Sequence, residues 1–63
     1  MIIIYNDATN EKWDINFDIP IPRVGETICF NFDLFEVQDV HYAIDLEQES
    51  YFIEITVKQK QQS

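Results

Sequence analysis

The stretch "DLFEVQDVHYAIDLEQE", residues 33–49, decides the fold, because it fits two kinds of secondary structure. As a helix, it places Val37, Val40 and Ile44 on one face. Asp33 and Glu36 would then resemble the capping box that begins many helices. A helix near residues 34–49 would make this an α+β protein.

A strand explains the same stretch if its alternation slips once. Residues two apart then share a face on each side of the slip at Gln38–Asp39, namely Phe35 and Val37 before it, and Val40, Tyr42 and Ile44 after it. One slip is what a β-bulge produces, and a bulge bends its strand. Because Val, Phe and Tyr also favour strands, we predict a bent strand here and keep the helix as the alternative.

Three other stretches alternate polar and apolar residues with a period of two, which indicates half-buried strands. Their predicted inward sets are Trp13, Ile15, Phe17 and Ile19 in "EKWDINFDI", Ile28, Phe30 and Phe32 in "TICFNF", and Tyr51, Ile53, Ile55 and Val57 in "YFIEITVK". The opening "MIIIYN" is apolar on both faces, as in a strand covered on two sides. The polar segments "NDATNE" and "DLEQES" are predicted turns.

The only glycine, Gly25, follows a segment in which Pro20 and Pro22 cannot donate to a central strand. We expect it to adopt a positive-φ turn that leads into a strand at Thr27–Phe32. The predicted fold is therefore all-β, a small five-stranded antiparallel and partly open barrel. Residues 1–58 would form its single domain, and residues 59–63 a disordered tail.

The entry segment and the bent strand resemble small Src-homology-3-like barrels, especially short uncharacterised proteins of bacteria and their phages. The matching positions in residues 20–57 are Pro22, Gly25, Glu26, Ile28, Phe35, Val37, Val40 and Tyr42. The resemblance implies a fold and transfers no activity. The chain lacks the paired-tyrosine and tryptophan groove of the peptide-binding members, because Trp13 is predicted to point inward.

Size and cysteine content limit how so short a chain can be stabilised. With 63 residues it lies near the lower limit for folding without staples, and a dimer that completes the core is one solution. Cys29 has no partner in the chain, which fits a reducing compartment. The first residues lack the basic flank and longer apolar run of a secretory signal, so we expect a cytoplasmic location.

Charge restricts the class of partner. Twelve acidic residues against four Lys and Arg give a net charge of −8. Direct binding of nucleic acid or an anionic membrane is not expected, because phosphates require clustered bases. A basic protein is the natural complement. We therefore expect a non-enzymatic protein-interaction domain that uses a strand edge or an acidic and apolar surface. The alternative is an acidic mimic of nucleic acid that inhibits a DNA- or RNA-binding protein.

The candidate partner-binding residues are one outward aromatic and the acids expected around it. Phe52 is out of phase with the inward residues of its strand, and an apolar patch with Cys29 or Ile3 would mark an interface. The full candidate set is Phe52, Glu54, Asp14, Asp18, Glu36 and Asp39.

Catalytic and metal chemistry find little support in the sequence. A nucleophile needs an adjacent base, and the only histidine, His41, has no sequence relation to Cys29. Asp39 and Asp45 flank His41, but a structural zinc site usually takes four ligands that include thiolates. We predict no catalytic residue, no cofactor and no specific metal site.

Overall fold

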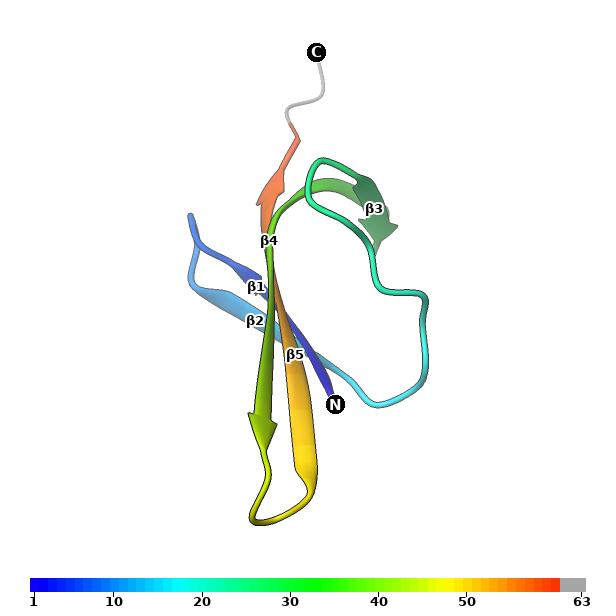
Figure 1. Cartoon of the computed structure of the whole chain (residues 1–63). Coiled ribbons are helices and arrows are strands. Elements are labelled where there is room, and N and C mark those ends of the chain that lie inside the picture. The colour runs from blue at the N-terminus through cyan, green and yellow to red at the C-terminus, as the bar shows by residue number, and fades with distance from the viewer. Residues whose placement is uncertain (61–63) are drawn as a thin grey trace.

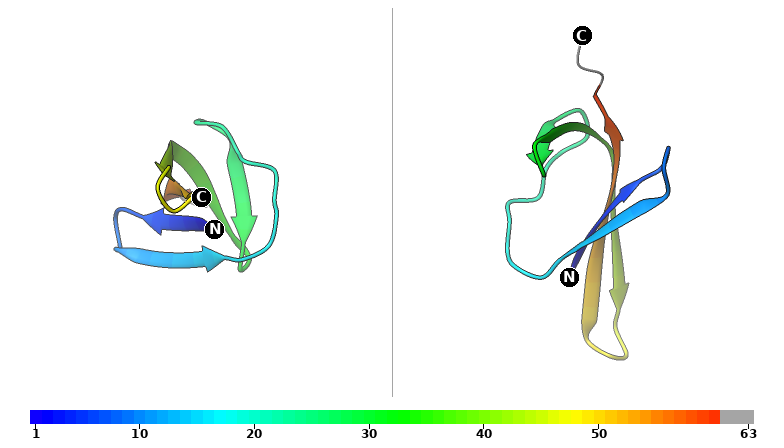
Figure 2. Two further views of the ribbon diagram at one scale, coloured as in Figure 1. Left: turned by 60° about the horizontal axis from the view of Figure 1, so that its bottom comes forward. Right: turned by 180° about the vertical axis from the view of Figure 1, so that it is seen from behind.

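A computed structural model describes residues 1–60, which form one strongly curled sheet of five strands (Figure 1). The strands are β1 (Ile2–Asn6), β2 (Glu11–Ile15), β3 (Thr27–Phe30), β4 (Asp33–Asp45) and β5 (Ser50–Gln59). Their order across the sheet is β2-β1-β5-β4-β3. The predicted all-β class is confirmed, and the sheet is an open half-barrel (Figure 2).

The sheet is mixed, so the predicted wholly antiparallel arrangement is wrong in one place. β1 pairs with β5 in parallel, with Ile4 opposite Ile55, whereas the other three pairs are antiparallel. Alternation along a strand records which face is buried and carries no information on the direction of its neighbour. β1 lies on the edge of β5 that β4 leaves free and runs in the same direction as β5.

The predicted bulge is confirmed, and the helical alternative for residues 34–49 is wrong. β4 continues through this stretch, and its register against β5 shifts between Val37 and Asp39. Val37 is buried at the bend, where its N–H donates to Glu26 O and its carbonyl accepts from Gly25 N, each over 2.9 Å. The bulge turns the first part of β4 over the top of the sheet (Figure 1).

Gly25 has the predicted left-handed conformation, with φ of +92°. A Cβ at this position would meet no atom within 4 Å, so the backbone angle and not crowding explains the glycine. A further hydrogen bond closes the turn, because the Arg23 N–H donates to Glu26 Oε1 over 2.6 Å. Gly25 thereby fixes the end of the proline-containing segment against β4.

The core lies on the inner face of the curl. Its buried members are Ile2, Ile4, Phe35, Val37, Ile53, Ile55 and Val57. β2 and β3 are not neighbours in the sheet, yet Trp13 and Phe30 meet edge to face with ring centroids 4.8 Å apart, and Phe30 stacks on Phe35 at 4.4 Å. Aromatic packing therefore spans the opening that the hydrogen-bonded strands leave.

Three large side chains predicted to point inward are instead exposed, namely Phe17, Phe32 and Tyr51, and so are Tyr42 and Ile44, which were predicted to share a face with Val40. Phe17 lies beyond the end of β2. β3 ends at Phe30, so Phe32 falls in the two-residue turn, where it is 97% exposed with a positive φ. The other three lie on β4 and β5, where those strands extend past the core.

The last described residues continue the sheet. β5 includes Gln59, and the Lys60 N–H donates to Leu34 O over 2.8 Å. The rest of the expected tail, residues 61–63, lies outside the described residues.

Candidate functional site

β4 and β5 pair with each other over a longer stretch than their neighbours, β1 and β3, can cover. β1 begins at Ile2, opposite Ile53, and β3 reaches only to Glu36 on β4. Residues 42–52 therefore project from the sheet as a two-stranded arm, seen at the bottom of Figure 1. The arm accounts for the elongated shape of the molecule, which measures 47 × 20 × 19 Å.

The inner face of the sheet stays apolar along the arm although nothing covers it there. The exposed side chains that we call the arm strip are Tyr42, Ile44, Leu46 and Tyr51. They line a shallow depression of about 330 Å³ together with Asp45 and Glu49. A clustered apolar surface with an acidic rim is typical of a protein-binding surface.

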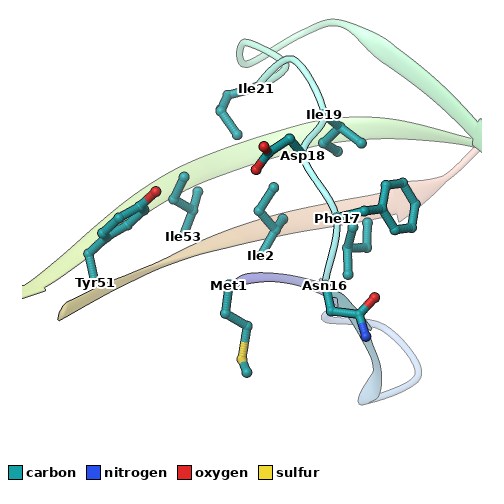
Figure 3. Close-up of a pocket in the computed structure, with 10 residues that line it drawn as sticks. Met1, Ile2, Asn16, Phe17, Asp18, Ile19, Ile21, Tyr51 and Ile53 are labelled. Atoms are coloured by element: carbon teal, nitrogen blue, oxygen red, sulfur yellow. The ribbon is translucent and has the colours of Figure 1, made fainter.

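A second depression lies at the base of the arm and has a volume of about 480 Å³. We call it the hollow. Asp18 turns its carboxylate toward it, whereas the ring of Phe17 points away (Figure 3). Tyr51 lines both the hollow and the arm depression, so the two adjoin at this side chain. The apolar lining of the hollow comprises Met1, Ile2, Ile15, Ile19, Ile21, Tyr51 and Ile53.

The proline-containing segment supplies one wall of the hollow. Pro20 and Pro22 each lack a backbone donor, which disfavours a sixth strand here. Ile19 and Ile21 are half-buried against the core, and Asp18 before them is exposed. The segment thus sets one carboxylate at the mouth of an otherwise mostly apolar depression.

Four of the six sequence-predicted residues gather around one row on the opposite, outer face of the sheet. Asp14 and Glu54 are the two cross-strand partners of Ile3, so the three residues form one row. His41 continues that row opposite Glu54, and Asp39 lies two residues before it on β4. Phe52 pairs with Ala43 at the start of the arm. The outer face therefore combines acids with a half-exposed apolar centre.

The remaining two predicted residues lie elsewhere. Asp18 belongs to the hollow on the inner side, and Glu36 lies opposite Lys58 near the bend of β4. The expected neighbourhood of Phe52 also divides. Ile3 lies on the adjacent strand one row away, but Cys29 pairs with Leu34 at the far end of β4. Cys29 and Phe52 thus do not form one patch.

The structure keeps the reactive side chains apart. Cys29 is exposed opposite Leu34 of β4, and His41 lies seven residues beyond Leu34 on that strand, past the bulge. No group of three or more His, Cys, Asp and Glu side chains among residues 1–60 is arranged to hold a metal ion.

Sequence reasoning missed the arm strip because it predicted Tyr51 to point inward and placed Tyr42 and Ile44 only on a shared face with Val40. A signal was present in the lengths of the apolar stretches. The alternation that ends at Ile44 and the one that begins at Tyr51 each outlast the five-residue run "IIIYN" available to cover them. A long hairpin beside a short strand has to leave part of its apolar face open.

No protein-family model, curated protein or solved structure matches this chain. The fold is therefore described by its geometry, a small five-stranded half-barrel. None of the described residues belongs to a helix long and apolar enough to cross a membrane.

Proposed function

We propose that this chain is a non-enzymatic protein-interaction domain, which binds an apolar and basic segment of a partner protein in the hollow and along the arm strip. One observation carries the proposal: the apolar inner face continues beyond the core into an open surface with Asp18 at its side. A cytoplasmic, bacterial or phage-encoded barrel of the Src-homology-3-like type is the finer form of the same proposal.

The charge distribution favours a basic segment. Residues 24–57, which include the whole arm, contain no Lys or Arg. A Lys or Arg of the partner can lay its alkyl stem along the isoleucines of the hollow and bring its charge to Asp18. The surrounding negative field would also raise the rate of encounter with such a partner.

Magnitudes indicate that the arm strip alone is too small for tight binding. Fully burying one large apolar side chain contributes roughly 1.5–3 kcal/mol, and the strip has four, each already partly buried. Association costs an estimated 4–15 kcal/mol before any surplus appears. A stable complex therefore needs the hollow as well, so the partner segment should span both.

A charge reversal in the hollow tests the proposal against a matched control. Asp18→Lys and Asp7→Lys change the net charge equally, but Asp7 is an exposed residue of the β1–β2 turn. The three immobilised proteins are compared for the proteins that they retain from the source cell. A partner of the hollow is retained by the wild type and by Asp7→Lys, and is lost with Asp18→Lys. Identical sets on both variants would contradict the proposal.

The outer-face acids support the alternative function, a mimic of nucleic acid. Asp14, Glu54 and Asp39 share that face, with Lys12 and His41 among them. A mimic would retain a nucleic-acid-binding protein that added DNA displaces, and Asp14→Lys would weaken the binding. If the partner binds in the hollow, added DNA does not compete with it, and Asp14→Lys has little effect on its binding.

A further inference from the structure

The free edge of β4 is the longest unpaired backbone edge in the described part of the chain. β3 pairs with β4 only over residues 33–36, and Gly25 and Glu26 extend that contact to Val37. From Gln38 to Asp45 no described strand lies on this side of β4. Such an edge is a template for a further strand.

The outward backbone groups on this edge can be assigned. The Ile53 N–H donates to Met1 O and therefore points toward β1. Since backbone groups alternate sides along a strand, those of Phe52 and Glu54 point toward β4, where they pair with Ala43 and His41. The N–H and C=O groups that face outward then belong to Val40, Tyr42 and Ile44.

We propose that a second copy of this chain occupies the edge, antiparallel to the first, with the twofold axis at Ala43. Ala43 then faces Ala43 of the second copy. Tyr42 of each copy faces Ile44 of the other copy. The outward groups of Tyr42 and Ile44 form the hydrogen-bonded pairs. The interface is isologous, as expected for a cyclic dimer, and it joins two five-stranded sheets into one of ten strands.

The facing side chains favour this register over those with the axis at Tyr42 or at His41. With the axis at Ala43, His41 faces Asp45 of the second copy, which is a favourable pair on the outer face. Asp39 then lies opposite Glu47, which belongs to the turn beyond the end of β4 and not to the paired strand. With the axis at Tyr42, Asp39 would instead face Asp45, and like charges directly opposite are destabilising. With the axis at His41, each Tyr42 faces Val40, and Ile44 gains no apolar partner.

Three features of the fold accommodate the second copy. Leu46, exposed at the tip of the arm, comes to face Val40 at the edge of the other core. Glu47 and Glu49 approach the loop of Arg23, which Gly25 ties to Val37. The residues that line the hollow lie away from the paired edges, whereas Leu46 of the arm strip contacts the second copy. This inference goes beyond the proposed function and does not depend on it.

Dimerisation joins two chains of net charge −8. Added salt screens their repulsion and should strengthen the dimer, whereas it should weaken the binding of a basic partner. The first test measures the mass of the wild type by light scattering or sedimentation across protein concentration and NaCl concentration. We expect a concentration-dependent rise toward twice the chain mass of 7.5 kDa. A monomer at every salt concentration, up to about 1 mM protein, overturns the proposal.

A variant that blocks the edge should leave the fold intact. The Tyr42 N–H faces outward, so Tyr42→Pro removes no hydrogen bond within the chain, and proline is tolerated at such edge positions. We expect at least a tenfold rise in the dimer dissociation constant, with an unchanged circular dichroism spectrum. A folded Tyr42→Pro variant that still dimerises as the wild type does would contradict edge pairing.

Cysteine cross-linking determines the register. In a Cys29→Ser background, Ala43→Cys places two thiols at a non-hydrogen-bonded pair, where Cα atoms lie about 4.5 Å apart, within the range for a disulfide. In Tyr42→Cys, the Cα atoms of the two cysteines would lie about 8 Å apart. In Phe52→Cys, they would be separated by three strand spacings. Oxidation should give a covalent dimer with Ala43→Cys only. Efficient cross-linking of Tyr42→Cys or Phe52→Cys instead would refute the register.

Discussion

The core and the arm are two parts of the same two strands, and they differ in burial although they share one pattern. On β5, Ile53 is 6% exposed and Tyr51, two residues earlier on the same face, is 62% exposed. On β4, Val37 is buried and Ile44 is open. Val37 and Ile44 are both aliphatic, so the type of side chain does not explain the difference between them.

The difference arises from the number of neighbouring strands. At the core, β1 and β2 extend the sheet on one side, and the bulge at Val37 curls β4 and β3 over the inner face. On the arm, two strands alone present a face that nothing folds back to cover. A two-stranded hairpin is marginally stable by itself, so the arm depends on its continuity with the core or on a partner. Exposed apolar residues on the arm thus indicate binding, and the same residue types in the core indicate folding.

The largest predicted effect comes from removing one core side chain. Ile55 is 0% exposed, and truncating a fully buried Ile to Ala costs roughly 2–5 kcal/mol. A domain of this size typically has about 3–9 kcal/mol of stability in total. Ile55→Ala should therefore unfold at much lower urea concentration, or be unfolded without denaturant.

The matched change on the arm is Ile44→Ala. It should change the free energy of unfolding of the monomer by less than about 0.5 kcal/mol, because Ile44 is largely exposed. Urea titrations at low protein concentration compare the two variants. Similar losses for both would show that the arm face is buried in solution and would break the distinction.

A loss of stability smaller than that of Ile55→Ala is expected at the turn of Gly25, which closes the core end of the sheet. Gly25→Ala forces a side chain into a left-handed conformation, which costs about 1–2 kcal/mol. No atom would clash with the new Cβ, so Gly25→Asn, which tolerates this region better, should lose less. An Ala variant as stable as the wild type would mean that Gly25 does not hold this conformation in solution.

A stabilising change is predicted at Phe32 in the β3–β4 turn. Phe32 is exposed because it lies in a turn, whereas the aromatic side chains of the arm lie on an uncovered face of the sheet. Asn31 and Phe32 both have positive φ, 52° and 68°, the combination for which Asn-Gly is preferred. Relief of about 1–2 kcal/mol of strain exceeds the entropic cost of glycine, roughly 0.5–1 kcal/mol. Phe32→Gly should raise the thermal midpoint, and Phe32→Ala, which keeps a Cβ, should not.

A small effect on stability is also expected from shortening the arm. Deleting Ile44, Asp45, Ser50 and Tyr51 together preserves the alternation of both strands and joins residues 46–49 to Ala43 and Phe52. The deletion also removes Asp45 Oδ1, which accepts from the Glu47 and Gln48 N–H groups of the turn. Because these residues are exposed, we expect a change within about 1 kcal/mol. The shortened chain should remain folded and monomeric at concentrations where the wild type dimerises. Unfolding on deletion would show that the arm contributes to the core.

Much of the strand content could be predicted because it depends on local patterns. The slip at Gln38–Asp39 identified the bulge, and the single glycine after Pro22 identified the positive-φ turn. The hairpin turn at residues 46–49 followed from its polar sequence. Strand ends were less predictable. Phe17 and Phe32 continue the alternation but lie past the last pairing, because pairing depends on the partner strand.

The candidate site could be predicted only in part. Exposure of Phe52 and of the acids on the outer face follows from phase along a strand. The position of Asp18 beside an apolar hollow depends on where the proline-containing segment packs, and no local pattern specifies that.

The sequence by itself determined which residues share a face, where the chain bends, and that the surface is negative, because alternation, glycine and charge act locally. Only the tertiary structure decided that β1 runs parallel to β5 and that the apolar face continues uncovered onto an arm. The physical reason is that burial depends on the lengths of neighbouring strands and on the curl of the sheet, which involve residues far apart in the chain. A stretch of alternating residues marks an apolar face, and the strands around it decide whether that face becomes core or binding surface.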